Sequence, residues 1–259
     1  IALMEGVEDI PDTALHEGLP WTWESFPQYL ESLAARRYDI DIAALLPHGP
    51  LRVYAMGERA VRREAATAQD LQAMQQLVAE GIAAGAVGLS TSRTMAHRSK
   101  SGEFTPMYEA ASDELRQLGL SLQNHPNSVF QMISDFDHPE DEFQILSDVC
   151  ASTGCAGTLT VLQYPHKPQL HRELLRLIEA ANQQGHTVIG QILNRPVGVL
   201  MGFDCTLNPF SCRPSYLALA HMTPEQRHHA LRQPATRAAI LGEQDQNPHL
   251  FMEYFGHNY

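Results

Sequence analysis

Short apolar segments alternate along this chain with longer amphipathic segments, and this alternation constrains the fold more than any other feature. The apolar segments predict strands at five places, residues 40–46, 86–90, 129–134, 158–163 and 187–193. Between them, apolar residues at helical period predict helices at residues 69–84, 139–152 and 169–184. Strands that alternate with helices of this length indicate βαβ units and a parallel sheet.

A parallel sheet of this kind closes into a (β/α)8 barrel only when eight strands are present. The chain has 259 residues, about the length of one such barrel, but it supplies only five candidate strands. We therefore predict an α/β fold, a TIM-like (β/α)8 barrel that is incomplete in this chain. Further helices are predicted at residues 25–37, 223–231 and 235–241, and another begins at Pro106 with Thr105 as its cap.

The amino-acid composition disfavours two classes of binding partner, nucleic acids and membranes. The net charge is −12 with the histidines neutral, which disfavours nucleic acid and anionic membranes as partners. No run of 18 apolar residues and no signal peptide is visible, so we expect no membrane association. The few, widely spaced cysteines fit reduced thiols in a cytoplasm rather than a disulfide scaffold or a zinc ribbon. Oligomeric state is not fixed by the pattern, and a homo-oligomer stays open.

Chemistry in parallel α/β folds lies at the carboxyl ends of the strands, so the residues after each strand are the first candidates for a site. Polar or titratable side chains follow all five predicted strands. They are His48, then Arg93, His97 and Arg98, then Asp135 and Asp137, then Gln163, and last Gln191 and Asn194. We call this carboxyl edge of the sheet the rim. If the rim served only packing, polar side chains would not be needed after every strand, although loops are polar in any case.

Individual roles at this rim stay open. His48 suits the binding of a metal or a substrate carbonyl, and equally the capping of a loop. Arg93 and Arg98 carry the planar guanidinium that binds a carboxylate bidentately, but solvated loop arginines are the plain alternative. We favour Asp135 over Asp137 for function, because Asp137 directly precedes a predicted helix and can cap it.

Other motif-like features are discounted. Gly88-Leu89-Ser90-Thr91-Ser92 nearly fits a nucleophile elbow, but its last position is Ser and no triad order follows. His228 and His229 are adjacent on a predicted helix, so their side chains diverge and do not chelate one ion together. The chain contains no H-x-H at a strand end and no H-E-x-x-H, so we assign no metal ligand within it.

Several strings in the first hundred residues resemble the N-acyl-D-amino-acid deacylase (D-aminoacylase) family of the amidohydrolase superfamily. They keep the family's order and spacing, which is more specific than one short motif. The strings are Glu5-Gly6-Val7-Glu8-Asp9-Ile10-Pro11, Trp21-Thr22-Trp23-Glu24-Ser25-Phe26-Pro27-Gln28-Tyr29-Leu30, Pro47-His48-Gly49-Pro50-Leu51-Arg52-Val53-Tyr54, Met56-Gly57-Glu58-Arg59 and Gly85-Ala86-Val87-Gly88-Leu89-Ser90-Thr91-Ser92-Arg93-Thr94.

The resemblance implies that residues 1–259 are the central part of one amidohydrolase barrel domain, without the flanking barrel strands and the β-sandwich. It implies a hydrolase that cleaves a non-peptide C–N bond, an amide of a small molecule and typically of an N-acyl-D-amino acid, by a zinc-activated water. The zinc ligands and the catalytic aspartate are expected mainly outside this chain. The expected substrate-pocket residues are His48, Arg93, His97, Asp135, Gln163 and Gln191, and the catalytic residues stay unknown.

Two positions depart from the family's pattern. Gln163 stands where the better-characterised deacylases have a histidine, and Gln191 lies in a strand where they offer Asp or His. Glutamine is a poor zinc ligand. Two alternatives to the deacylase hypothesis therefore stay open. One is a non-catalytic barrel homologue that binds an amide-containing ligand, and the other is a hydrolase of cyclic amides.

Overall fold

The computed structural model describes residues 5, 7, 10–99, 102–125, 127–164, 167–195, 201–203, 205 and 208–246. The chain divides into two compact units. The larger unit, Thr13–Thr94 with Phe104–Asn194, contains the sheet, and the smaller one comprises Ile1–Asp12, Met95–Glu103 and Arg195–Tyr259.

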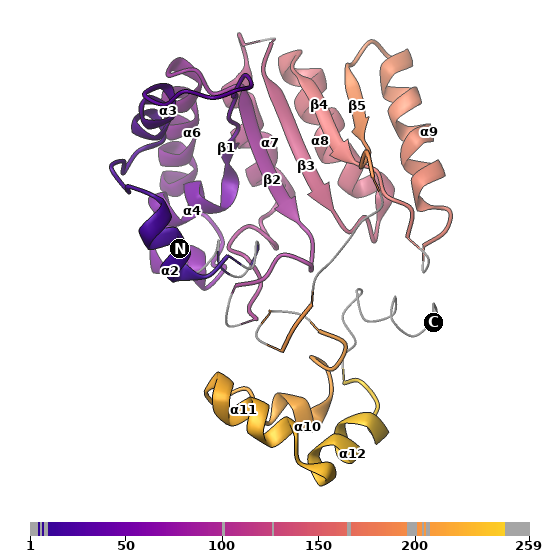
Figure 1. Cartoon of the computed structure of the whole chain (residues 1–259). Helices are drawn as coiled ribbons and strands as arrows, with labels where there is room; N and C mark the ends of the chain where they lie inside the picture. Colours follow the sequence, from indigo (N-terminus) through magenta and orange to yellow (C-terminus); the bar gives the residue numbers. More distant parts are fainter. Residues whose placement is uncertain are drawn as a thin grey trace. The chain divides into compact units, whose positions relative to one another are not determined.

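The larger unit is built on one parallel sheet. Its strands follow the order of the chain and lie side by side as β1-β2-β3-β4-β5 (Figure 1). They are β1 (Leu46–Pro47), β2 (Gly88–Arg93), β3 (Val129–Ser134), β4 (Ala156–Thr160) and β5 (Val188–Gln191). The order confirms the predicted α/β fold, and the five described strands form an open sheet rather than a closed barrel.

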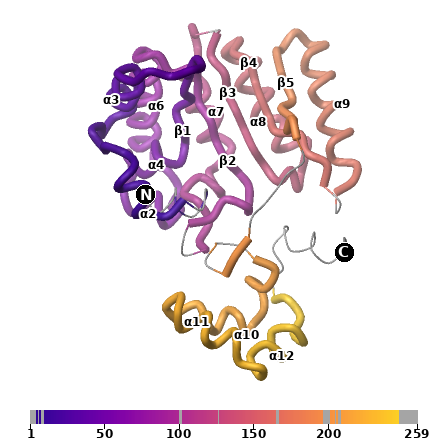
Figure 2. The backbone as a smooth tube through the Cα atoms, viewed as in Figure 1, coloured from indigo at the N-terminus to yellow at the C-terminus, as the bar shows by residue number. Residues whose placement is uncertain are grey.

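Helices alternate with these strands and cover one face of the sheet. Figure 2 shows the chain returning behind the sheet between strands, as right-handed parallel connections require. The helices of this unit are α2 (Asp12–Gly18), α3 (Phe26–Ala34), α4 (His48–Met56), α5 (Glu58–Val61), α6 (Ala68–Ala83), α7 (Ser112–Gly119) with the 3₁₀ turn Leu120–Leu122, α8 (Pro139–Thr153) and α9 (Leu170–Gln183). The apolar core lies between them and the sheet and includes the fully buried Phe130, Met132 and Leu159.

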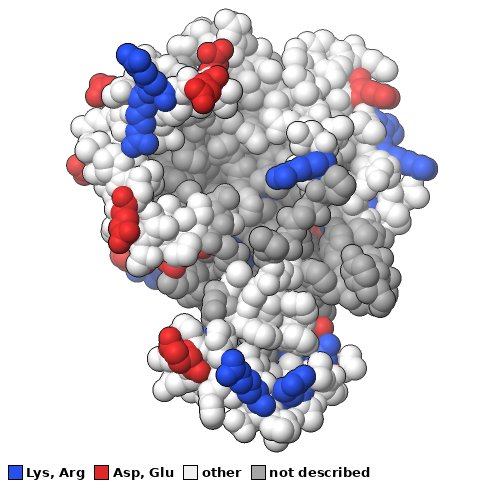
Figure 3. Space-filling view, viewed as in Figure 1, with Lys and Arg blue, Asp and Glu red and all other residues white. Residues whose placement is uncertain are grey.

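The register gives the opposite face of the sheet a polar character. Because side chains alternate along a strand, the neighbours of the buried Phe130 and Met132 point away from the helices. One row of paired residues on that face runs Ser90, Gln131, Thr158 and Ile189 across four strands. In the space-filling view most charged side chains lie around the edges of this face rather than across its middle (Figure 3). We call this surface the open face.

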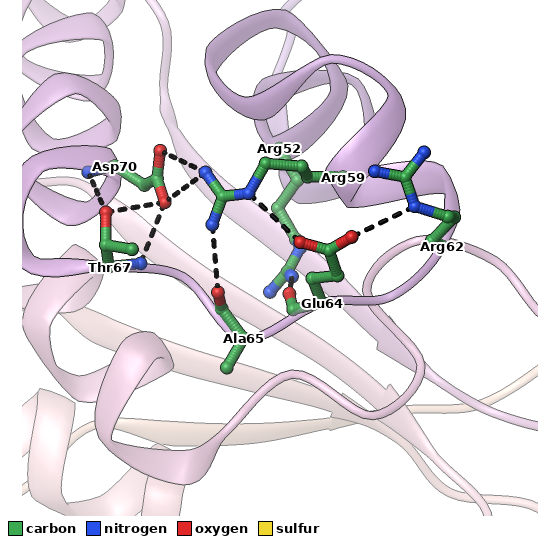
Figure 4. Close-up of polar contacts among 7 residues, drawn as sticks. All are labelled: Arg52, Arg59, Arg62, Glu64, Ala65, Thr67 and Asp70. Atoms are coloured by element: carbon green, nitrogen blue, oxygen red, sulfur yellow. Dashed lines mark hydrogen bonds and ion pairs between the residues drawn. The ribbon is translucent and has the colours of Figure 1, made fainter.

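The start of α6 illustrates how local sequence fixes an element. Thr67 accepts from the Asp70 backbone amide, and the Asp70 carboxylate accepts from the Thr67 amide, which forms a capping box (Figure 4). Arg59 Nη1 donates to both Asp70 oxygens at 3.1 and 2.9 Å, and Arg59 Nε donates to Glu64. These contacts tie α5 to the first turn of α6.

Most predicted elements are confirmed with small changes of boundary. The strand at 129–134 matches β3, and the helices at 69–84, 139–152 and 169–184 match α6, α8 and α9 within two residues. The strand at 40–46 is shorter than predicted, because only Leu46–Pro47 pairs with β2, while Ile40 is 74% exposed. The apolar composition of residues 40–46 predicted a longer strand than the pairing with β2 forms.

The prediction of a helix starting at Pro106 is wrong. Tyr108 N donates to Thr105 O at 3.1 Å in a turn, and α7 begins only at Ser112. The Ala110 carbonyl accepts from Arg93 Nη1 at 2.5 Å. A tertiary contact therefore uses a carbonyl that a longer helix would need for its own ladder.

Among the described residues of the smaller unit lie three short helices that follow one another in the chain, α10 (Pro214–Leu217), α11 (Pro224–Leu231) and α12 (Pro234–Gly242). They enclose a small core of Tyr216, Leu219 and Ile240, and they confirm the helices predicted at 223–231 and 235–241. Among the described residues, no helix is long and apolar enough to cross a membrane.

Candidate functional site

Asp135 directly follows the last residue of β3 at the rim. Its Oδ1 accepts from Thr94 Oγ1 at 2.5 Å, and Thr94 directly follows β2. Lys167 Nζ donates to the Asp135 carbonyl at 3.0 Å and forms an ion pair with Asp137. Burial raises the pKa of the Tyr164 phenol, and the nearby negative charge of Asp135 raises it further. Segments after three strands thus meet at Asp135, as the strand-end rule predicts.

Arg93 ends β2 and is held by protein acceptors. Its Nε and Nη2 donate to the two Glu142 oxygens at 2.7 and 3.0 Å, and its Nη1 donates to the Ala110 carbonyl. The Ser134 hydroxyl donates to Glu142 Oε2 at 3.0 Å. The bidentate pair is the geometry that favours Arg over Lys, but here its carboxylate comes from α8 rather than from a ligand.

His48 starts α4 and is 1% exposed. Its Nε2 lies 2.8 Å from Glu114 Oε1, and its Nδ1 lies 2.9 Å from Thr91 Oγ1. A carboxylate only accepts, so Nε2 donates to Glu114 and Nδ1 accepts from the Thr91 hydroxyl. Arg52 Nη1 donates to both Glu114 oxygens at 2.6 Å. Both ring nitrogens of His48 therefore face protein groups in the core beneath the sheet.

Charge is balanced within this buried network. Burial lowers the pKa of His48, so the ring stays neutral although Glu114 opposes the shift. Burial raises the pKa of Glu114, but the hydrogen bond from His48 and the charge of Arg52 outweigh it and the pKa falls below its usual value. The network thus contains one anion, one cation and a neutral imidazole.

Gln191 lies on the open face at the end of β5. Its Oε1 is 3.4 Å from Gln131 Nε2, and its register partner on β4 is Thr160. Gln163 follows β4 and is exposed. The two glutamines that depart from the family's pattern therefore lie at the ends of neighbouring strands, Gln163 just after β4 and Gln191 as the last residue of β5, and both side chains are exposed.

His97 and Arg98 belong to the smaller unit, so their position relative to the strand ends is not defined. Both side chains are half-buried. Arg98 donates to the carbonyls of Met95 and Gly102 at 3.2 and 2.9 Å, which closes its own loop. The predicted pocket role of His97 stays a prediction.

Metal binding needs several ligands in one place. Within the part of the chain that the structure describes, no three His, Cys, Asp or Glu side chains come close enough to hold an ion. The described residues alone do not fit a zinc centre.

Sequence reasoning missed four charged or phenolic residues at these sites. Glu114 and Glu142 sit on helices, where a carboxylate normally indicates a solvated surface. Tyr164 and Lys167 lie in the loop after β4 and meet Asp135 only through the fold. The available signal was the position of Glu114 and Glu142 in the acidic first turns of α7 and α8, which also has a simple explanation in the helix dipole.

A parallel sheet with helices on one face and polar side chains at its strand ends defines the class of protein, an α/β protein of parallel-sheet type. The family model described as amidohydrolase family matches residues 1–239, and the chain belongs to this family. This confirms the resemblance drawn from the sequence strings at the level of the family.

Two relatives make the likeness more specific. Over 115 residues the chain is 29% identical to the D-aminoacylase of Alcaligenes xylosoxydans xylosoxydans, which covers 44% of this chain and 21% of the relative. It also resembles a solved structure, "Crystal structure of D-aminoacylase defines a novel subset of amidohydrolases", with a TM-score of 0.52 and 24% identity. That match covers 65% of this chain and 33% of the other. The chain therefore spans between a fifth and a third of these proteins, and the structural likeness supports the fold.

Proposed function

We propose that this chain is part of a metal-dependent hydrolase that cleaves a non-peptide C–N bond, with an N-acyl-D-amino acid as substrate. Membership in the amidohydrolase family and the similarity to a D-aminoacylase support the class of reaction. The observation that carries the proposal is Asp135, a carboxylate that three strand-end segments hold at the rim where barrel enzymes carry out their chemistry.

The residues at the rim divide into two groups under this proposal. Asp135, Gln163 and Gln191 bind the substrate, because a carboxylate and primary amides match the N–H and C=O groups of an amide. We expect His97 to line the same substrate pocket. His48 and Arg93 act behind the pocket, since their polar atoms contact Glu114 and Glu142.

Membership in the amidohydrolase family is the ground for including zinc in the proposal, and the described residues supply no zinc site. Its ligands would come from parts of the protein other than those described, as Gln163 and Gln191 are poor ligands. A cytoplasmic location is part of the same proposal, in keeping with the four free cysteines.

Activity of the full-length protein tests the proposal. With zinc present, amine release from N-acetyl-D-amino acids is expected, and their L-isomers serve as the matched control. Asp135→Asn should lower kcat/KM about 10- to 100-fold, the value of a lost hydrogen bond to a charged group. Asp113→Asn is the control, because the Asp113 side chain is 92% exposed. No amine release from either isomer, with an empty metal site, would overturn the proposal.

A non-catalytic homologue that binds an amide-containing ligand is the second candidate. It is favoured by the amide pair Gln131–Gln191 on the open face and by the glutamines Gln163 and Gln191, which are poor metal ligands. Calorimetric binding of an N-acyl-D-amino acid without turnover and without bound metal would select it.

A hydrolase of cyclic amides is the other alternative, and release of a ring-opened product from a dihydropyrimidine would select that one.

A further inference from the structure

Phe136 has a backbone conformation that bulky residues rarely adopt. Its φ is +48°, in the left-handed region, although the side chain is 2% exposed and packs in the core. Such strain persists only where the surroundings hold it, and it is concentrated at functional sites. Phe136 lies between Asp135 and Asp137, the two carboxylates that follow β3. The turn at Phe136 therefore directs the chain toward Asp137, and its amide bond to Ser134 spans Asp135.

A chain of hydrogen bonds holds this turn from the side of the helices. The Phe136 amide donates to Ser134 Oγ at 3.1 Å, and the Ser134 hydroxyl donates to Glu142 Oε2 at 3.0 Å. Glu142 is in turn fixed by Arg93 through Nε and Nη2. The register pairs Arg93 with Ser134 across β2 and β3, which brings the participants together. The side chains of Arg93 and Glu142 are 15% and 19% exposed, so their bonds face little competition from water.

A second set of contacts holds the same turn from the other side. Thr94 donates to the Asp135 carboxylate, and Lys167 contacts both the Asp135 carbonyl and the Asp137 carboxylate. Thr94 directly follows Arg93 in the chain. One strand end thus supplies neighbouring residues to the two sides of the turn.

We propose that Arg93, Glu142 and Ser134 are positioning residues that hold the Phe136 turn and thereby fix the Asp135 carboxylate at the rim. The function of that carboxylate rests on the proposed hydrolase, whereas the positioning itself does not. Arg93 then has a different role from the substrate clamp that its position suggested. Its Nε, Nη1 and Nη2 already donate to Glu142 and Ala110, and a substrate carboxylate would have to displace Glu142.

Hydrogen exchange of the Phe136 amide in the full-length protein tests the positioning directly. In the wild type this buried amide should exchange slowly. Ser134→Ala should speed its exchange at least 10-fold, and so should Glu142→Gln, which touches neither Phe136 nor Asp135. Ser152→Ala is the matched control, because Ser152 bonds only backbone carbonyls at the far end of α8. Unchanged exchange in Glu142→Gln overturns the proposal, and this variant also decides the case if Ser134→Ala does not fold.

A double-mutant cycle tests whether the positioning acts through Asp135. Ser134→Ala should lower kcat/KM about 10-fold in the wild type and less than 2-fold in the Asp135→Asn background, since coupled residues are non-additive. An equal loss in both backgrounds would mean that Ser134 only stabilises the fold, which overturns the link to Asp135. If the wild type releases no amine, the proposed function fails, and the exchange measurement still decides whether the turn is held as inferred.

Discussion

Glu114 is the residue on which the buried polar network of the larger unit depends. It accepts from His48 and Arg52, which are 1% and 2% exposed, and it joins α4 to α7. Glu114→Ala would leave the Arg52 guanidinium buried without its anion. Breaking a buried pair on one side typically costs about 3–5 kcal/mol. We expect a loss of this size in the free energy of urea unfolding.

Glu109→Ala is the control for that measurement. Glu109 is 64% exposed and lies 3.8 Å from Arg63, so its loss should change stability by less than about 1 kcal/mol. Equal effects of the two substitutions would contradict a structural role for the Glu114 network.

His48 predicts a pH dependence of stability with a defined sign. Burial lowers its pKa in the folded state, whereas the unfolded chain keeps a value of about 6.5. As pH falls below about 6.5 the unfolded state takes up a proton that the folded state resists, so stability is lost. His48→Gln removes this titration. Its destabilising effect should therefore be smaller at pH 5 than at pH 7.5, by at most about 2 kcal/mol, in paired urea titrations. The same effect at both pH values would show that the pKa of His48 is not lowered in the folded state, which would contradict this account of the buried ring.

At the scale of elements, Gly88 sets the distance between β2 and β3. Its φ is +151°, and a Cβ at this position would lie 1.8 Å from the Val129 carbonyl oxygen. Gly88→Ala cannot be relieved by a side-chain rotation, because the obstacle is backbone. We expect a loss of more than about 3 kcal/mol by urea unfolding, at the upper end for single substitutions.

Gly18→Ala is the matched substitution, because a Cβ on Gly18 meets nothing within 4 Å. It should be neutral or slightly stabilising, since alanine loses less backbone entropy than glycine on folding. A Gly88→Ala variant as stable as Gly18→Ala would contradict the register of β2 and β3.

The sequence was most informative for elements whose pattern and environment agree. β3 matched its prediction because Phe130 and Met132 face the core while turn residues bound the strand at both ends. Residues 40–46 are equally apolar, yet most of them find no neighbouring strand. The residues of the candidate site also differ in how far the sequence alone reveals them. Asp135 could be found from the strand-end rule, whereas Glu142 could not, because its contact with Arg93 joins residues 49 positions apart.

In the whole molecule, the described residues of this amidohydrolase-family chain form one open sheet of five parallel strands. Helices cover one face, and the open face carries Gln131 and Gln191. The network around Glu114 and the turn at Phe136 lie within this one unit. Stability and site geometry therefore depend on the same strand ends, which is why substitutions there need both an unfolding measurement and an activity measurement.

The central claim is that the rim around Asp135 belongs to an amide hydrolase. Amine release from N-acetyl-D-amino acids by the full-length protein with zinc tests it most directly, with Asp135→Asn and Asp113→Asn measured in parallel. We expect release from the D-isomers, a kcat/KM about 10- to 100-fold lower in Asp135→Asn and no change in Asp113→Asn. Release that is unaffected by Asp135→Asn, or no release by a folded and zinc-loaded wild type, would contradict it.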